Sequence, residues 1–128
     1  MTEIIKSKQF DLEDRTLRFA KNIRWFVKKL EKDISNIEDI KQLIRSSGSI
    51  GANYIEANES LSKKDFLMRL KISRKEAKES VFWLKLLNIN NEETEALRNK
   101  LILESTEIMK IFGSIITKSE KGSFEINN

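Results

Sequence analysis

The sequence predicts an all-α protein, an up-down-up-down bundle of four helices. Apolar residues recur at three- and four-residue spacing in four segments, about residues 11–32, 35–58, 62–88 and 92–117. The absence of proline and the presence of only four glycines favour long helices joined by short turns. The 128 residues, of which 39% are hydrophobic and 34% charged, suffice for one globular domain with a buried core.

The first segment, residues 11–32, is expected to begin at Asp11, because a carboxylate suits the N-cap of a helix. Its apolar face consists of Leu12, Thr16, Phe19, Ala20, Ile23, Phe26, Val27 and Leu30. Trp25 lies roughly opposite this face. A small basic patch is formed by Lys21, Arg24 and Lys28.

The second segment, residues 35–58, offers a capping box in which Ser35 pairs with Glu38. Its predicted inward face contains two glycines, each of which costs about 1 kcal/mol relative to alanine. The face consists of Ile37, Ile40, Ile44, Ser47, Gly48, Gly51, Tyr54, Ile55 and Asn58. Because the glycines keep the phase of this face, we interpret the segment as one continuous helix. We expect both glycines to let a neighbouring helix approach closely.

The third segment, residues 62–88, begins at a clear capping pair, Ser62 with Asp65. One apolar stripe, expected in the core, consists of Phe66, Leu70, Ser73, Ala77, Val81 and Leu84. A second stripe consists of Met68, Ile72, Phe82, Trp83 and Leu86. These residues could stack nucleic-acid bases, but an exposed stripe of this size is a liability in a monomer. We therefore expect it to form an interface between subunits.

The fourth segment, residues 92–117, can be capped by Asn90 or Asn91 and carries glutamates in its first turn. Its apolar stripe consists of Leu97, Leu101, Ile108, Phe112 and Ile115, widened by Ile102, Met109 and Ile116. Residues 118–128 have no usable period and are expected to form a mobile tail.

The residue inventory argues against most catalytic chemistry. There is no histidine and no cysteine, which removes histidine-based triads, thiolate chemistry, disulfides and most zinc sites. We therefore expect a non-enzymatic protein with no cofactor and no metal. No apolar run approaches the roughly 18 residues of a membrane span, and the N-terminus does not resemble a signal peptide. From these features we expect a cytoplasmic protein that does not interact with a membrane.

Charge is concentrated in the third segment. Residues 63–88 hold eight Lys or Arg against three Asp or Glu, a net charge of +5, whereas residues 36–62 carry −2. At about 100° per residue, six of the basic residues fall on one side of the helix: Lys64, Lys71, Arg74, Lys75, Lys78 and Lys85. Such a stripe can contact phosphates without sequence choice. The alternative is an ordinary solvated helix surface.

The polar side of the second segment carries Arg45, Ser49, Asn53 and Glu56 at three- and four-residue steps. These residues could form a ligand or ion site. We favour a hydrogen-bonded face buried in a subunit contact. Glu56, Glu76 and Glu79 could in principle bind a metal inside a bundle, but without histidine we do not expect it.

The run QLIRSSGSIGANYIEANES, followed by SKKDFLMRLKISRKEAKES, resembles the four-helix-bundle proteins encoded within bacterial 23S rRNA intervening sequences. The resemblance covers about residues 10–117, and its distinctive part is Gly48, Gly51, Ala52, Asn53 and Glu56. It implies a closed homopentamer of bundles. It also implies a distant similarity to the accessory variability protein of diversity-generating retroelements, a basic pentamer that binds nucleic acid and a reverse transcriptase. It implies no catalytic residues.

Two functions are consistent with these observations. The first is a non-enzymatic, oligomeric helical scaffold whose basic surfaces bind RNA or DNA without sequence readout. The second is an adaptor whose partner is another protein and which makes no nucleic-acid contact. The effect of salt on partner binding distinguishes the two functions, because phosphate contacts weaken steeply with ionic strength whereas apolar protein contacts do not.

Overall fold

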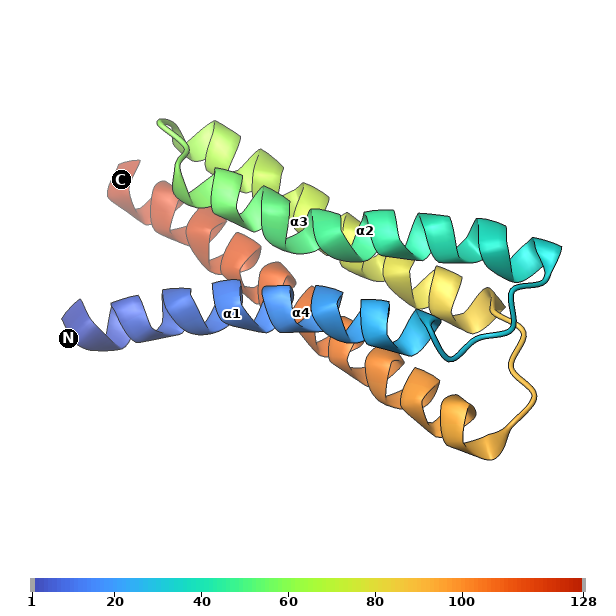
Figure 1. Cartoon of the computed structure of the whole chain (residues 1–128). Coiled ribbons are helices and arrows are strands. Elements are labelled where there is room, and N and C mark those ends of the chain that lie inside the picture. Colours follow the sequence, from blue (N-terminus) through green and yellow to red (C-terminus); the bar gives the residue numbers. More distant parts are fainter. Residues whose placement is uncertain (1, 128) are drawn as a thin grey trace.

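The computed structural model of the chain describes the backbone of residues 2–127 and the side chains of residues 12–122. It contains four helices, α1 (Thr2–Val27), α2 (Ile34–Asn58), α3 (Lys63–Leu86) and α4 (Glu92–Asn127), and no strand within residues 2–127. Successive helices run in opposite directions (Figure 1). The all-α prediction with four helices is therefore confirmed. No helix among the described residues is both long and apolar enough to cross a membrane.

The first helix differs from the predicted range of residues 11–32 at both ends. It begins upstream at Thr2, so Asp11 lies inside the helix rather than at its start. It ends at Val27, where the chain turns. The ammonium group of Lys32 donates to the carbonyls of Val27 and Leu30 at 2.7 Å each. The carbonyl of Val27 also accepts the N–H of Leu30 at 3.2 Å, and the lysine gives it a second donor where the helix ends.

The second helix begins one residue earlier than predicted and uses a different cap. The side chain of Asp33, not Ser35, accepts the backbone N–H of Asn36 at 2.8 Å, and this bond lowers the pKa of Asp33. Asn36 is buried and links both loops at this end of the bundle. Its amide donates to the carbonyls of Glu31 and Asn88 and accepts the N–H of Asn88. A single polar side chain thus fixes the two loops together.

The third helix is capped as expected, because the Ser62 hydroxyl accepts the N–H of Asp65 at 3.1 Å. The fourth is capped by Asn91, which accepts the N–H of Thr94 at 2.8 Å. The helix then continues to Asn127, through most of residues 118–128, for which a tail without helical periodicity was predicted. No proline interrupts residues 118–127, and the glycine there does not adopt a positive φ. Nothing local therefore ends the helix.

The apolar face of α1 is buried as predicted, but the face of α2 is rotated from its predicted direction. Ile37 and Ile55 are 39% and 52% exposed, whereas Leu43 and Ile50 are fully buried. The reason is the position of its neighbours, since α2 contacts α3 more extensively than α1. The arc that faces α3 therefore became the centre of the buried side.

Small polar residues allow α3 to approach α2 and α4 closely. The hydroxyls of Ser46 and Ser80 lie 2.8 Å apart. Ser73 donates to the carbonyl of Ile50 at 2.8 Å, and Ser105 of α4 donates to the carbonyl of Ala77 at 2.8 Å. Each of these four hydroxyls therefore has a hydrogen-bond partner on a neighbouring helix. By contrast, α1 and α4 cross and share the least extensive contact of the four neighbouring pairs (Figure 1).

Candidate nucleic-acid interface

The six basic residues predicted to share one side of α3 are all exposed in the folded chain. The opposite side of the helix is held in the core by Leu70, Ala77 and Leu84, each fully buried, and this fixes the basic side outward. The stem of Arg74 passes beside Gly113 of α4, so this residue lies at the edge nearest α4. None of the six forms an ion pair within the part of the chain whose side chains are described.

The basic residues and the second apolar stripe occupy the same outer side of α3. Met68 and Leu86 are each 48% exposed and Phe82 is 57% exposed. A shallow groove of about 500 Å³ shows the mixture, because its lining alternates between cations and apolar side chains. It is lined by Lys64, Asp65, Leu67, Met68, Lys71, Ile72 and Lys75. The two sets of residues, predicted as separate stripes, therefore share one exposed surface.

The two aromatic residues of this side have different environments. Phe82 projects outward, and its ring meets that of Trp83 edge to face, with centroids 5.0 Å apart. Trp83 and Ile72 are half-buried against the core of their own chain. The indole N–H of Trp83 is buried and has no hydrogen-bond partner among the described residues. Part of the predicted subunit interface is thus already covered within the monomer.

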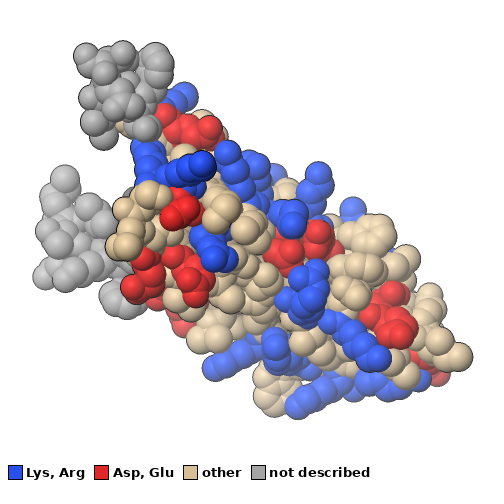
Figure 2. All heavy atoms as spheres, turned by 90° about the horizontal axis from the view of Figure 1, so that it is seen from above, with Lys and Arg blue, Asp and Glu red and all other residues tan. Residues whose placement is uncertain are grey.

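Seen from above, the molecule shows its basic side chains in several groups, separated by acidic and uncharged residues (Figure 2). The surface is therefore positively biased but not a single continuous patch. Such a distribution suits several separate phosphate contacts along an extended polyanion better than one concentrated anion site.

The polar side of α2 makes its contacts within the chain. Arg45 pairs with the buried Glu76 at 3.2 Å and with Glu79 at 3.3 Å, both on α3. Asn53 donates to Ser49 at 2.9 Å and accepts from Arg69 of α3 at 3.0 Å. The contacts of Arg45 with the two glutamates and of Asn53 with Arg69 join α2 to α3. A subunit contact at this side stays a prediction.

Three glutamates are the candidate metal ligands that the sequence offers, Glu56 on α2 and Glu76 and Glu79 on α3. Glu56 is exposed on α2, away from the pair formed by Glu76 and Glu79 with Arg45. Among the described residues, no group of three acidic side chains is arranged to hold a metal ion. The buried carboxylate of Glu76 has the guanidinium of Arg45 as its ionic partner.

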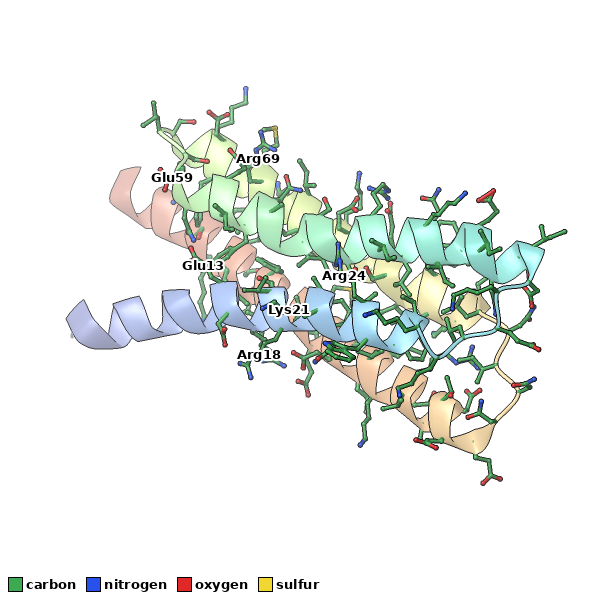
Figure 3. All side chains as sticks on the ribbon, in the orientation of Figure 1. Glu13, Arg18, Lys21, Arg24, Glu59 and Arg69 are labelled. Atoms are coloured by element: carbon green, nitrogen blue, oxygen red, sulfur yellow. The ribbon has the colours of Figure 1, made fainter. Side chains whose placement is uncertain are left out.

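The two glycines of α2 are not equivalent, which corrects the expectation that both meet a neighbouring helix. A Cβ at Gly51 would lie 2.8 Å from Oγ1 and 3.2 Å from Cβ of Thr16 on α1. A Cβ at Gly48 would meet only a guanidinium nitrogen of Arg24, at 3.9 Å. Arg24 reaches from α1 toward α2 across an open groove of about 450 Å³ (Figure 3). Close packing therefore applies to Gly51 and not to Gly48.

An ion-pair network that the sequence did not reveal joins α1 to α4. Arg15 donates to both carboxylate oxygens of Glu104, at 2.7 and 2.8 Å, and to Glu107 at 2.6 Å. The network raises the pKa of Arg15, and the bond from Arg15 lowers the pKa of Glu104. The partners are about 90 residues apart in the chain, so no local pattern could identify them.

Comparison with known proteins identifies the family. Residues 8–114 match the family described as 23S rRNA-intervening sequence protein. The chain is also similar to the crystal structure of a protein with unknown function from the S23 ribosomal protein family of Bacteroides thetaiotaomicron. The two are 38% identical, the match covers 86% of this chain and 98% of that chain, and the TM-score is 0.71. No curated protein matches the sequence. The resemblance seen in the residues is therefore confirmed, and the chain belongs to the 23S rRNA-intervening sequence protein family.

Proposed function

We propose that the protein is a non-enzymatic helical scaffold that binds RNA or DNA through the outer side of α3. The observation that carries this proposal is the set of six exposed basic side chains with no ion pair in the described part of the chain. Such cations gain free energy by replacing the counterions of phosphates. Five of the six are lysines, which contact phosphate as point charges, so we expect little base preference.

Three exposed basic residues on α3 provide the main test. Changing Lys71, Arg74 and Lys78 together to glutamate should abolish a salt-sensitive gel shift with long RNA or DNA at about 50 mM salt. Helicity should persist, because glutamate is nearly as good a helix former as lysine. A matched control changes three exposed lysines of α4, Lys110, Lys118 and Lys121, by the same total charge. If wild type gives no salt-sensitive shift, or if the control loses binding equally, the α3 proposal is wrong.

Self-association is a separate part of the proposal. The exposed Met68, Phe82 and Leu86 favour burial against another surface, and a ring of five copies is the number that the family resemblance implies. Repeating the basic side around an assembly would favour long nucleic acids over short ones through effective concentration. A stable monomer at micromolar concentration in sedimentation experiments would overturn this part and leave the α3 phosphate contacts to be judged by the gel shift.

The same apolar residues support an alternative, an adaptor for another protein. A protein partner that covers Met68, Phe82 and Leu86 would also bury the lysines between them, which is costly unless the partner is acidic. Nucleic acid and such a partner would therefore exclude each other. Binding of a protein partner that is abolished by Phe82→Glu but persists in added salt, in a protein that gives no salt-sensitive shift with RNA or DNA, would favour the adaptor.

A further inference from the structure

A second surface, between α1 and α4, centres on Trp25. This side chain is 67% exposed, more than any other aromatic residue among residues 12–122. The ammonium group of Lys28, in the turn that follows α1, lies 5.1 Å from the centre of the indole ring. This cation–π contact restrains the ring at the surface. A large, flat and restrained aromatic ring is a suitable platform for stacking.

Trp25 also forms one wall of a pocket of about 320 Å³ between the two helices. The pocket is lined by Asn22, Trp25, Phe26, Lys29, Leu97, Lys100 and Leu101. Phe26 and Leu101 are buried and provide an apolar floor, whereas Asn22, Lys29 and Lys100 are exposed at the rim. The volume is at the lower end of the roughly 300–1,000 Å³ of small-ligand sites.

All the charged residues that line this pocket are positive. Its lining contains two lysines and no acidic residue, and Lys28 adds a third cation beside the ring. None of these lysines forms an ion pair within the described residues. Glu104, four residues after Lys100 on α4, forms an ion pair with Arg15. An anionic ligand with a flat apolar part therefore fits the surface better than a neutral or cationic one.

We propose that this pocket binds an unpaired nucleotide of a single-stranded nucleic acid. The base stacks on Trp25, the flanking phosphates contact Lys29 and Lys100, and the amide of Asn22 offers a donor and an acceptor to the edge of the base. Single-strand sites in proteins combine aromatic platforms with cations in this way. A duplex should bind poorly here, since its bases are already stacked and paired. The site lies on α1 and α4 and does not depend on the basic side of α3.

An anionic membrane is the main competing occupant for a tryptophan flanked by lysines. Insertion into a bilayer interface requires a projecting apolar face. Here the apolar floor is recessed between the helices, and of the apolar residues that line the pocket only Trp25 is prominently exposed. The recess favours a flat ligand that enters the pocket.

Tryptophan fluorescence tests the inference directly, because the chain has only two tryptophans. In a Trp83→Phe background, Trp25 is the single reporter. Titration with a single strand of about six nucleotides, within the site sizes of single-strand-binding domains, should quench it saturably. The RNA and DNA forms of one sequence show whether the 2′-hydroxyl matters. The Lys29→Glu, Lys100→Glu double variant should weaken binding about tenfold or more. The matched Lys110→Glu, Lys118→Glu variant, which changes two exposed lysines outside both proposed sites, should leave quenching by the short strand unchanged.

A second measurement keeps the proposal testable if the Trp83 variant does not fold. With the otherwise unchanged protein and a labelled strand, Trp25→Leu should lower affinity about tenfold in fluorescence anisotropy, whereas Trp25→Phe should retain much of it. The inference is wrong if the strand does not bind, if the matching duplex binds as well, or if the Lys29, Lys100 variant behaves as wild type. A blue shift with phosphatidylserine vesicles but not with strands would instead assign the surface to membranes. If the wild-type protein gave no salt-sensitive gel shift with a long duplex while Trp25 was still quenched by the single strand, the α3 proposal alone would be wrong.

Discussion

The two sides of α2 show how differently small residues can be used in one helix. Toward α3, Ser46 is fully buried and its hydroxyl meets that of Ser80 at 2.8 Å. Toward α1, Gly51 is in contact with Thr16, but Gly48, three residues earlier, borders an open groove crossed only by Arg24. The side of α2 that faces α3 is closely packed, whereas the side that faces α1 is only partly packed.

This difference teaches that a small residue does not by itself mark close packing. At Ser46 and Gly51 a neighbouring helix is near enough that any larger side chain would collide. At Gly48 an added Cβ would meet only the end of the Arg24 side chain, at 3.9 Å, so the glycine carries its conformational cost without close packing against another described helix. The predictions below measure the two sides by equilibrium unfolding at one fixed protein concentration, because self-association would shift apparent stability.

A substitution on the side of α2 that faces α3 should have the largest effect on the free energy of unfolding. Replacing Ser46 by leucine should lower the free energy of unfolding by about 3 kcal/mol, because it overpacks the contact and leaves the hydroxyl of Ser80 with one partner fewer. Urea denaturation with an unchanged m-value measures this loss. Gly48→Leu is the matched control and should change stability by less than about 1 kcal/mol. Equal losses in both variants would remove the distinction between the sides.

Gly51 tests the contact between α1 and α2. Gly51→Ala should destabilise by about 1–3 kcal/mol, since the new methyl group would overlap Oγ1 of Thr16. Thr16 is buried and its hydroxyl is bonded to the carbonyls of Leu12 and Glu13, so it cannot easily move away. In a Thr16→Ala background the effect of Gly51→Ala should shrink, and a double-mutant cycle gives the coupling. Strict additivity would contradict direct contact.

Gly48 should respond in the opposite direction. Gly48→Ala should stabilise the protein by about 0.5–1 kcal/mol, because alanine is the better helix former and the added methyl group meets only the flexible end of Arg24. Thermal unfolding should show a higher midpoint than wild type. A clear loss of stability would mean that another subunit or partner fills the groove beside this glycine.

The α1–α4 contact should give the smallest effect, because it relies on partly exposed ion pairs. Glu104→Gln should cost about 0.5 kcal/mol or less at pH 7 and low salt. The folded pKa of Glu104 is lowered, so its contribution is present above the unfolded pKa of about 4.3 and is lost as pH falls through the folded value. Wild type and variant should therefore converge in acid and at high salt. A difference that persists in acid would assign the loss to packing.

The elements that sequence periodicity predicted well are those with a single buried arc. The apolar face of α1 is one such case, since Phe19, Ile23 and Phe26 are all buried as expected. Ser62 capped α3 as predicted because a cap depends only on residues within one turn. Asp33 was missed as the cap of α2 because Ser35 offered an equally good local pattern, and the choice depends on where the chain leaves the preceding loop.

The candidate site was predicted in its residues but not in its arrangement. The basic residues of α3 emerged from charge and helical spacing alone, and all six are exposed. Their mixture with Met68, Phe82 and Leu86 became apparent only when the buried side of α3 was fixed by its neighbours. The pocket beside Trp25 needed residues from α1 and α4, which no local pattern connects.

The sequence by itself determined four helices, their caps in part, the positive charge of α3 and membership of the family, because each depends on short-range spacing or on residue identity. Only the tertiary structure decided which arc of α2 is buried and which of its glycines is in close contact. The physical reason is that a helix presents its side chains all round its axis, and α2 has suitable small or apolar residues on more than one arc. The crossing positions of α1 and α3 select among those arcs, and the sequence of α2 alone carries no information about them.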